Sequence, residues 1–106
     1  MTEIAAISAE ESRKRVEAGA LLVDVRSDAG RSASGSLLGS IPVAKDAVDV
    51  FAANTPKDAE IVVFCGTTAG SGPVVDRLQE QGFTNVTHVE GGFEALSAAG
   101  LPADPA

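Results

Sequence analysis

The chain has 106 residues, of which 44% are hydrophobic, so it can bury one compact core but not two. We therefore expect a single domain spanning residues 1–106. A formal net charge of −7 argues against nucleic acid or an anionic membrane surface as the main partner. The acidity instead favours solubility or the docking of a basic protein.

The cysteine count bears on disulfides and metal sites, and the N-terminus bears on where in the cell the protein is expected. A single cysteine cannot form an internal disulfide, and one cysteine with one histidine is too few for a typical zinc site. The first residues have neither the basic start nor the apolar core of a secretion signal, and no apolar run approaches the length of a membrane span. We therefore expect a cytoplasmic protein that uses no metal and no other cofactor.

The chain begins with a strand, a helix and a second strand. Residues 3–7 predict a short edge strand. Ser8 and Glu11 have the spacing of a capping box, which predicts a helix over residues 9–18. The mostly apolar residues 21–25 then predict a buried strand.

The next segment contains a polar pair, a long loop and two short elements. Asp24 and Arg26, at the end of the second strand, are expected to form a structural polar pair. Residues 29–40 are rich in Ser, Gly and Ala and predict a long loop. A brief strand over residues 40–43 contains a proline, which favours an edge of the sheet, and residues 46–53 predict a short helix.

The second half of the chain is organised around one apolar strand. Residues 61–64 are apolar and predict the central strand. A helix is predicted to begin near Ser71 to Pro73 and to end at Gly82, because an apolar stripe at helical spacing follows: Val74, Val75 and Leu78.

The last elements complete the alternation. Residues 86–89 predict another strand, Gly91 and Gly92 a turn, and residues 93–99 a last helix. Strands that alternate with helices imply an α/β class fold in three layers, α/β/α, with a mostly parallel five-stranded sheet.

The only cysteine directly follows the central strand. In sheets of this kind, ligands bind beyond the carboxyl ends of the strands, where Cys65 is expected to lie. The backbone N–H groups of the small residues after Cys65, together with the start of the next helix, would favour a nucleophilic thiolate. The plainer interpretation is an inert, buried cysteine with Thr and Ser present for turn geometry. The predicted cradle consists of Gly66, Thr67, Thr68, Ala69, Gly70 and Ser71.

Several motifs along almost the whole chain together resemble the single-domain rhodanese-like sulfurtransferase family. No one motif is specific, but their order and spacing are. They are Leu22-Val23-Asp24-Val25-Arg26, residues 35–41, Val63-Phe64-Cys65, Gly82-Phe83-Thr84-Asn85-Val86, Glu90-Gly91-Gly92-Phe93 and Gly100-Leu101-Pro102.

The resemblance implies that Cys65 is the catalytic residue at the head of a six-residue loop, Cys65 to Gly70. Cys65 would take a sulfane sulfur from a small donor, such as thiosulfate or a persulfide, and hold it as a persulfide in the cradle of residues 66–71. It would then pass the sulfur to cyanide or to a thiol acceptor, such as a thioredoxin-like protein. Neither nucleic acid nor a membrane is an expected partner.

The sequence also departs from the family pattern. Many members have Arg at the sixth loop position, where this chain has Gly70, so a cation that would hold thiosulfate is missing. Arg31 is expected to be a solvated loop residue. His88, the only histidine, is expected to have a supporting or surface role rather than to act as a general base.

Two other functions remain open. One is a catalytically weak rhodanese-like module for binding or sulfur sensing, which Gly70 and the charge-free loop favour. The other is a cysteine phosphatase or arsenate reductase, which is disfavoured because those related domains usually have a loop one residue longer and a closing arginine.

Overall fold

The computed structural model describes residues 6–66 and 68–103, which form one five-stranded sheet with helices. The strand order is β1-β5-β4-β2-β3, and all four pairs are parallel. β4 is central and the two-residue strands β1 and β3 lie at the edges, which confirms the predicted sheet. Residues 3–5 of the first predicted strand lie outside the described residues. The strands are β1 (Ala6–Ile7), β2 (Leu21–Asp24), β3 (Ile41–Pro42), β4 (Ile61–Phe64) and β5 (Val86–Val89).

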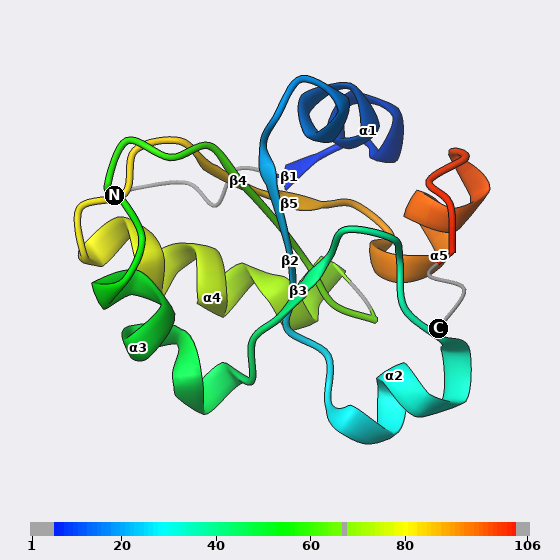
Figure 1. The fold of residues 1–106 in the computed structure, drawn as a ribbon, viewed down its shortest axis with the longest axis horizontal. Coiled ribbons are helices and arrows are strands. Elements are labelled where there is room, and N and C mark those ends of the chain that lie inside the picture. The colour runs from blue at the N-terminus through cyan, green and yellow to red at the C-terminus, as the bar shows by residue number, and fades with distance from the viewer. Residues whose placement is uncertain (1–5, 67, 104–106) are drawn as a thin grey trace.

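The helices cover both faces of the sheet, as the α/β/α prediction requires. Figure 1 shows α1 on one side of the sheet and both α3 and α4 on the other. The helices are α1 (Ala9–Glu17), α2 (Asp28–Ser34), the 3₁₀ helix η1 (Lys45–Ala47), α3 (Val48–Ala53), α4 (Thr68–Glu80) and α5 (Gly92–Ala98).

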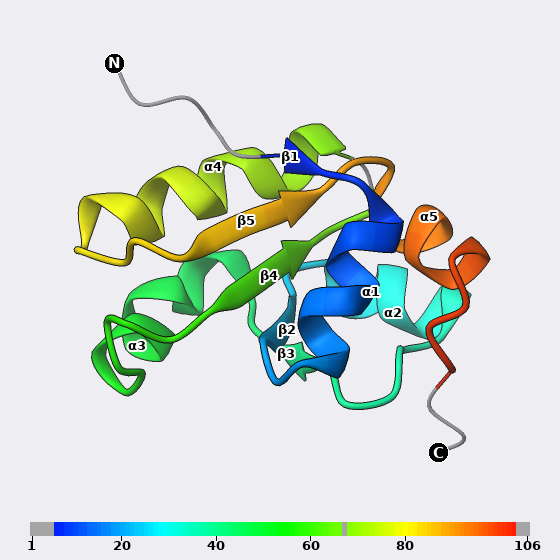
Figure 2. The same cartoon turned by 90° about the horizontal axis from the view of Figure 1, so that it is seen from above.

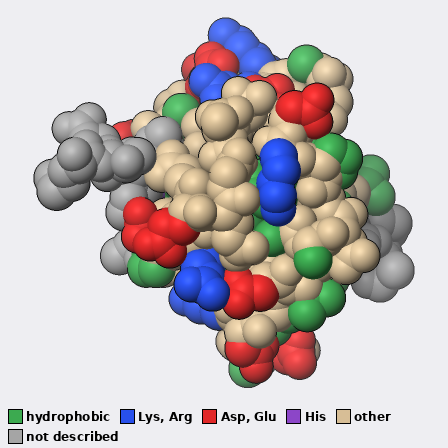
Figure 3. Space-filling model, turned by 90° about the vertical axis from the view of Figure 1, so that its left-hand side faces the viewer, with side chains coloured by type: hydrophobic (Ala, Val, Ile, Leu, Met, Phe, Trp, Pro, Cys, Tyr) green, Lys and Arg blue, Asp and Glu red, His purple; other side chains and the backbone are tan. Residues whose placement is uncertain are grey.

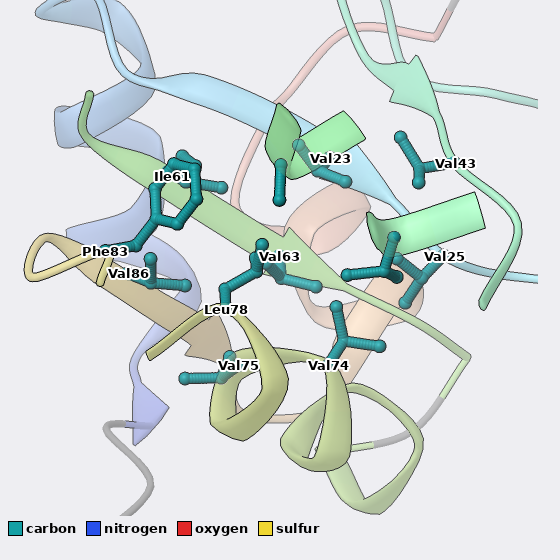
Figure 4. Close-up of a cluster of buried hydrophobic side chains, with 12 residues drawn as sticks. Val23, Val25, Val43, Ile61, Val63, Val74, Val75, Leu78, Phe83 and Val86 are labelled. Carbon is teal, nitrogen blue, oxygen red and sulfur yellow. The ribbon is translucent and has the colours of Figure 1, made fainter. Parts of the chain in front are cut away.

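Alternation along the central strands divides the core into two clusters. Successive side chains of a strand point to opposite faces of the sheet. Ile61 and Val63 of β4 therefore pack with α3 and α4, as Figure 4 shows for α4, whereas Val62 and Phe64 pack on the side of α1 and α5. The predicted inward stripe of the fourth helix is confirmed, since Val74, Val75 and Leu78 are all buried.

The first helix begins and ends where its capping residues predict. The Ser8 hydroxyl accepts a hydrogen bond of 3.1 Å from the Glu11 backbone N–H, which satisfies one of the unpaired donors of the first turn. The helix ends at Glu17, and Gly19 follows with a φ of 114°, which glycine adopts readily.

The predicted loop over residues 29–40 is wrong in its first half, because α2 occupies Asp28–Ser34. Ser27 caps this helix by accepting a 3.1 Å hydrogen bond from the Gly30 N–H. Because Gly and Ser have low helix propensity, the composition of this segment did not predict a helix. Arg31 ties it to the fold, since its guanidinium donates to the Arg26 carbonyl at 2.8 Å and pairs with Asp28.

Asp24 and Arg26 form the predicted polar pair at the end of β2, and both are buried. The Arg26 Nη2 donates to Asp24 Oδ2 at 2.7 Å and to the Gly35 carbonyl at 2.8 Å. The Arg26 guanidinium also lies 4.2 Å from the centre of the Phe93 ring. One side chain thus joins β2, the end of α2 and the start of α5.

We expect Asp24→Asn to lower the free energy of unfolding by about 3 kcal/mol, because it leaves the Arg26 charge buried without its counter-ion. Urea denaturation at neutral pH measures this change. Asp49→Asn is the control, because Asp49 pairs with Arg77 on the exposed surface and should matter little. An equal loss of unfolding free energy in the two variants would show that the buried pair stabilises the fold no more than the exposed pair does.

Candidate functional site

Cys65 lies at the carboxyl edge of the parallel sheet, directly after the central strand β4. Figure 2 shows β4 and β5 side by side and pointing in the same direction, with α5 near their carboxyl ends. Cys65 is partly buried and packs against the core cluster that contains Val25, whereas Gly66 is exposed. Cys65 therefore lies between the core and the solvent-exposed Gly66.

The helix after the loop begins earlier than the sequence predicts. It starts at Thr68 rather than near Ser71 to Pro73, so Thr68, Ala69 and Gly70 belong to its first turn. Pro73 stands in the second turn, where it cannot donate the usual hydrogen bond to the carbonyl four residues before it. The proline was therefore a misleading start signal. Thr67 lies outside the described residues.

Ser71, the last residue of the predicted cradle, is fully buried and contacts the only histidine. Its hydroxyl lies 2.8 Å from Nδ1 of His88, which is itself only 4% exposed. This contact joins α4 to β5 across the sheet edge. His88 is therefore not at the surface, and its supporting role stays a prediction.

The turn between β5 and α5 contacts the loop of Cys65, which sequence reasoning did not foresee. The Phe93 N–H donates a 2.9 Å hydrogen bond to the Cys65 carbonyl. A side chain on Gly92 would overlap that carbonyl oxygen and lie 2.9 Å from the carbonyl carbon and oxygen of Gly66. The only sequence signal for this approach is the Gly91-Gly92 pair itself.

Arg31 is not the solvated loop arginine that the sequence predicts. Its side chain is only 17% exposed and is held by Asp28 and by the Arg26 carbonyl, because α2 brings it back against the end of β2. It lines a hollow of about 360 Å³ together with Val25 and Lys45. Since Val25 also packs against the cluster that includes Cys65, this hollow lies at the same sheet edge as the thiol.

A second hollow of about 240 Å³ lies between η1 and α4. Arg77 and Asp49 line it as an ion pair, with hydrogen bonds of 2.9 and 2.8 Å. The hydrogen bonds from Arg77 hold the pKa of Asp49 below its ordinary value. On the face shown in Figure 3, acidic and basic side chains lie in small interspersed groups, so this face carries mixed charge.

The described part of the chain offers neither a metal-binding cluster nor a membrane-spanning helix. Within residues 6–66 and 68–103, no group of three or more His, Cys, Asp and Glu side chains could hold a metal ion. In the same part of the chain, no helix is both long and apolar enough to cross a membrane.

Comparison with known proteins assigns the family. The family model of the rhodanese-like domain matches residues 8–99. A protein of Pseudomonas savastanoi pv. phaseolicola named thiosulfate sulfurtransferase GlpE is 36% identical over 98 residues, which are 92% of each chain. A protein of the same name from Haemophilus influenzae is 32% identical over 100 residues, 94% of each chain.

A solved structure agrees with this assignment. The NMR structure of the rhodanese-like domain of the Alr3790 protein from Anabaena sp. superimposes with a TM-score of 0.80 at 24% identity, and covers 97% of this chain and 80% of that chain. The chain belongs to the rhodanese-like domain family. The resemblance seen in the sequence is thereby confirmed, and with it the predicted fold.

We expect Ser71→Ala to lower the free energy of unfolding by about 1 to 2 kcal/mol, because it removes a buried hydrogen bond to His88. Urea denaturation tests this, with Ser97→Ala at an exposed position of α5 as the control. If both variants unfold at the same urea concentration, the buried contact does not stabilise the junction of α4 and β5.

Proposed function

We propose that this protein is a rhodanese-type sulfurtransferase that moves a sulfane sulfur from a small donor, such as thiosulfate, to a thiol or to cyanide. The observation that carries the proposal is the place of Cys65, between the central strand β4 and the start of α4, in a chain of the rhodanese-like family. The names of the related proteins from Pseudomonas and Haemophilus support the same activity.

Sulfur transfer through Cys65 would proceed in two displacements. The Cys65 thiolate attacks the outer sulfur of thiosulfate, a bond forms between the two sulfurs, and the sulfur–sulfur bond of thiosulfate breaks so that sulfite leaves with the electron pair. An acceptor thiolate or cyanide then attacks the outer sulfur of the persulfide. The Cys65 thiolate leaves, so the enzyme is regenerated and no oxidant is required.

The persulfide would be held by backbone N–H groups of residues 66–71. A helix N-terminus carries unpaired N–H donors and a partial positive charge. Because α4 begins at Thr68, its first turn reaches closer to Cys65 than the sequence predicts, and this supports a cradle built from backbone dipoles. The buried Ser71 hydroxyl, the last side chain of this cradle, lies 2.8 Å from Nδ1 of His88.

The acceptor would be a thiol, for example on a thioredoxin-like protein, in the cytoplasm. The partial exposure of Cys65 and the exposure of Gly66 support the approach of a thiol from solvent at the carboxyl edge of the sheet. The single cysteine, which cannot form an internal disulfide, agrees with a reducing compartment.

The proposal predicts a covalent intermediate on Cys65. Thiosulfate should add one sulfur, about 32 Da, to the intact mass of the purified protein, and cyanide or reduced thioredoxin should then remove it. Cys65→Ser should show no mass gain. If neither thiosulfate nor a persulfide donor adds sulfur to the wild-type chain, the proposed activity is wrong and a binding function takes its place.

A second prediction concerns the glycine at the sixth loop position. Gly70→Arg should lower the half-saturating concentration of thiosulfate about fivefold, because a guanidinium near the cradle would attract the dianion with about 1 kcal/mol. Gly70→Gln is the control of similar length without charge. An unchanged or raised concentration, or an equal decrease with Gln, would refute the idea that a missing cation limits donor binding.

A further inference from the structure

The turn between β5 and α5 lies directly against the peptide that follows the reactive cysteine. The Cys65 carbonyl accepts the 2.9 Å hydrogen bond from the Phe93 N–H. Gly92 has a φ of 63°, and its Cα stands so close that any side chain there would overlap the Cys65 carbonyl oxygen. Glycine is therefore required at this position both by conformation and by space.

The direction of this carbonyl determines the direction of the next N–H. In a trans peptide, the C=O and the following N–H point to opposite sides, and the described chain has no cis peptide bond. While Phe93 holds the Cys65 carbonyl toward α5, the Gly66 N–H must point away from α5. The hydrogen bond from Phe93 thus also restricts the ψ angle of Cys65, which determines how the Gly66 N–H is oriented relative to the Cys65 side chain.

Contacts with Arg26 and Phe64 hold the Phe93 end of this contact in place. The Arg26 guanidinium lies 4.2 Å from the centre of the Phe93 ring and donates hydrogen bonds from Nε and Nη2 to the Asp24 carboxylate. The Phe64 ring, at the end of β4, lies 6.5 Å from the Phe93 ring. Phe93 is thus contacted by one side chain from the end of β4 and by another from the segment after β2, which restricts the movement of its N–H.

We propose that Gly92 and Phe93 are positioning residues for sulfur transfer, which hold the Cys65–Gly66 peptide so that the Gly66 N–H faces the sulfur on Cys65. Neither residue touches the donor. They act through one backbone carbonyl, and they determine the rate at which the thiolate reacts rather than the binding of the donor. This inference rests on the proposed function for the transfer step, but the reactivity of Cys65 tests it independently.

The decisive variant is Gly92→Ala, compared with Gly39→Ala. Gly39 also has a positive φ, 81°, but a side chain there would meet nothing within 4 Å. It precedes β3, which is the edge strand on the side of the sheet away from β5. Both variants therefore carry backbone strain, but only Gly92→Ala displaces the Cys65–Gly66 peptide. Thermal denaturation measures the shared strain.

Two rates are measured on each folded variant. In single-turnover persulfide formation from thiosulfate, Gly92→Ala should lower the maximal rate at least about tenfold relative to Gly39→Ala, with the half-saturating thiosulfate concentration unchanged. Alkylation of Cys65 by iodoacetamide should slow about fivefold. Equal rates in the two variants, or a loss that only follows the unfolded fraction, would overturn the proposal.

If Gly92→Ala does not fold, a second pair of variants tests whether Phe93 positions the Cys65–Gly66 peptide. Phe93→Leu keeps the backbone N–H but removes the ring beneath Arg26, and Phe51→Leu removes a partly buried ring from the other core cluster. Phe93→Leu should slow both reactions about threefold relative to Phe51→Leu, and equal rates would overturn the proposal. If the wild-type chain takes up no sulfur, the proposed function fails alone, and the alkylation rates still decide the role of Gly92 and Phe93.

Discussion

The buried ion pair of Asp24 and Arg26 is the constraint on which the site depends. A charged pair is costly to bury, and it is stable only when its remaining hydrogen bonds are satisfied. Here the guanidinium reaches Asp24, the Gly35 carbonyl and the face of Phe93 at once. These contacts join the end of β2, the segment after α2 and the start of α5, and Phe93 in turn holds the Cys65 carbonyl.

The parallel sheet explains why so many separate segments meet at this point. All parallel strands end at the same edge, so the residues after β2, β4 and β5 become neighbours although they are far apart in the chain. The hydrogen bond from the Val25 N–H to the Phe64 carbonyl, at 3.0 Å, continues the pairing of β2 and β4 up to the cysteine. The start of the loop is thus held by the segment after β2 and by the N–H of Phe93, which restricts the direction of its first peptide.

The proposed chemistry would rely on backbone groups more than on charged side chains. The arginines nearest the carboxyl edge are already engaged, since Arg26 pairs with Asp24 and Arg31 pairs with Asp28. The loop position that carries a cation in many relatives is Gly70. Fixed peptide dipoles need no reorganisation when charge develops during a reaction, which suits a cradle for a persulfide.

Local patterns predicted most of the elements correctly. The capping box at Ser8 and the apolar run of β4 are statements about neighbouring residues, and the structure confirms both. The prediction failed where local preference and tertiary contact disagree. The Gly and Ser content of residues 28–34 predicted a loop, whereas the structure has the helix α2, which Arg31 anchors to the end of β2. Pro73 suggested a helix start that the structure places at Thr68.

The fold class, the five strands, the cysteine at the end of the central strand and the family resemblance can all be predicted from the sequence alone. Periodicity and turn residues are local properties of the chain, and the order and spacing of the motifs can be followed along it. The contact of Ser71 with His88 and the approach of Gly92 to the Cys65 carbonyl are visible only in the tertiary structure. Such contacts join residues 17 and more positions apart, and their distances depend on how the sheet and its helices pack, which no local pattern encodes.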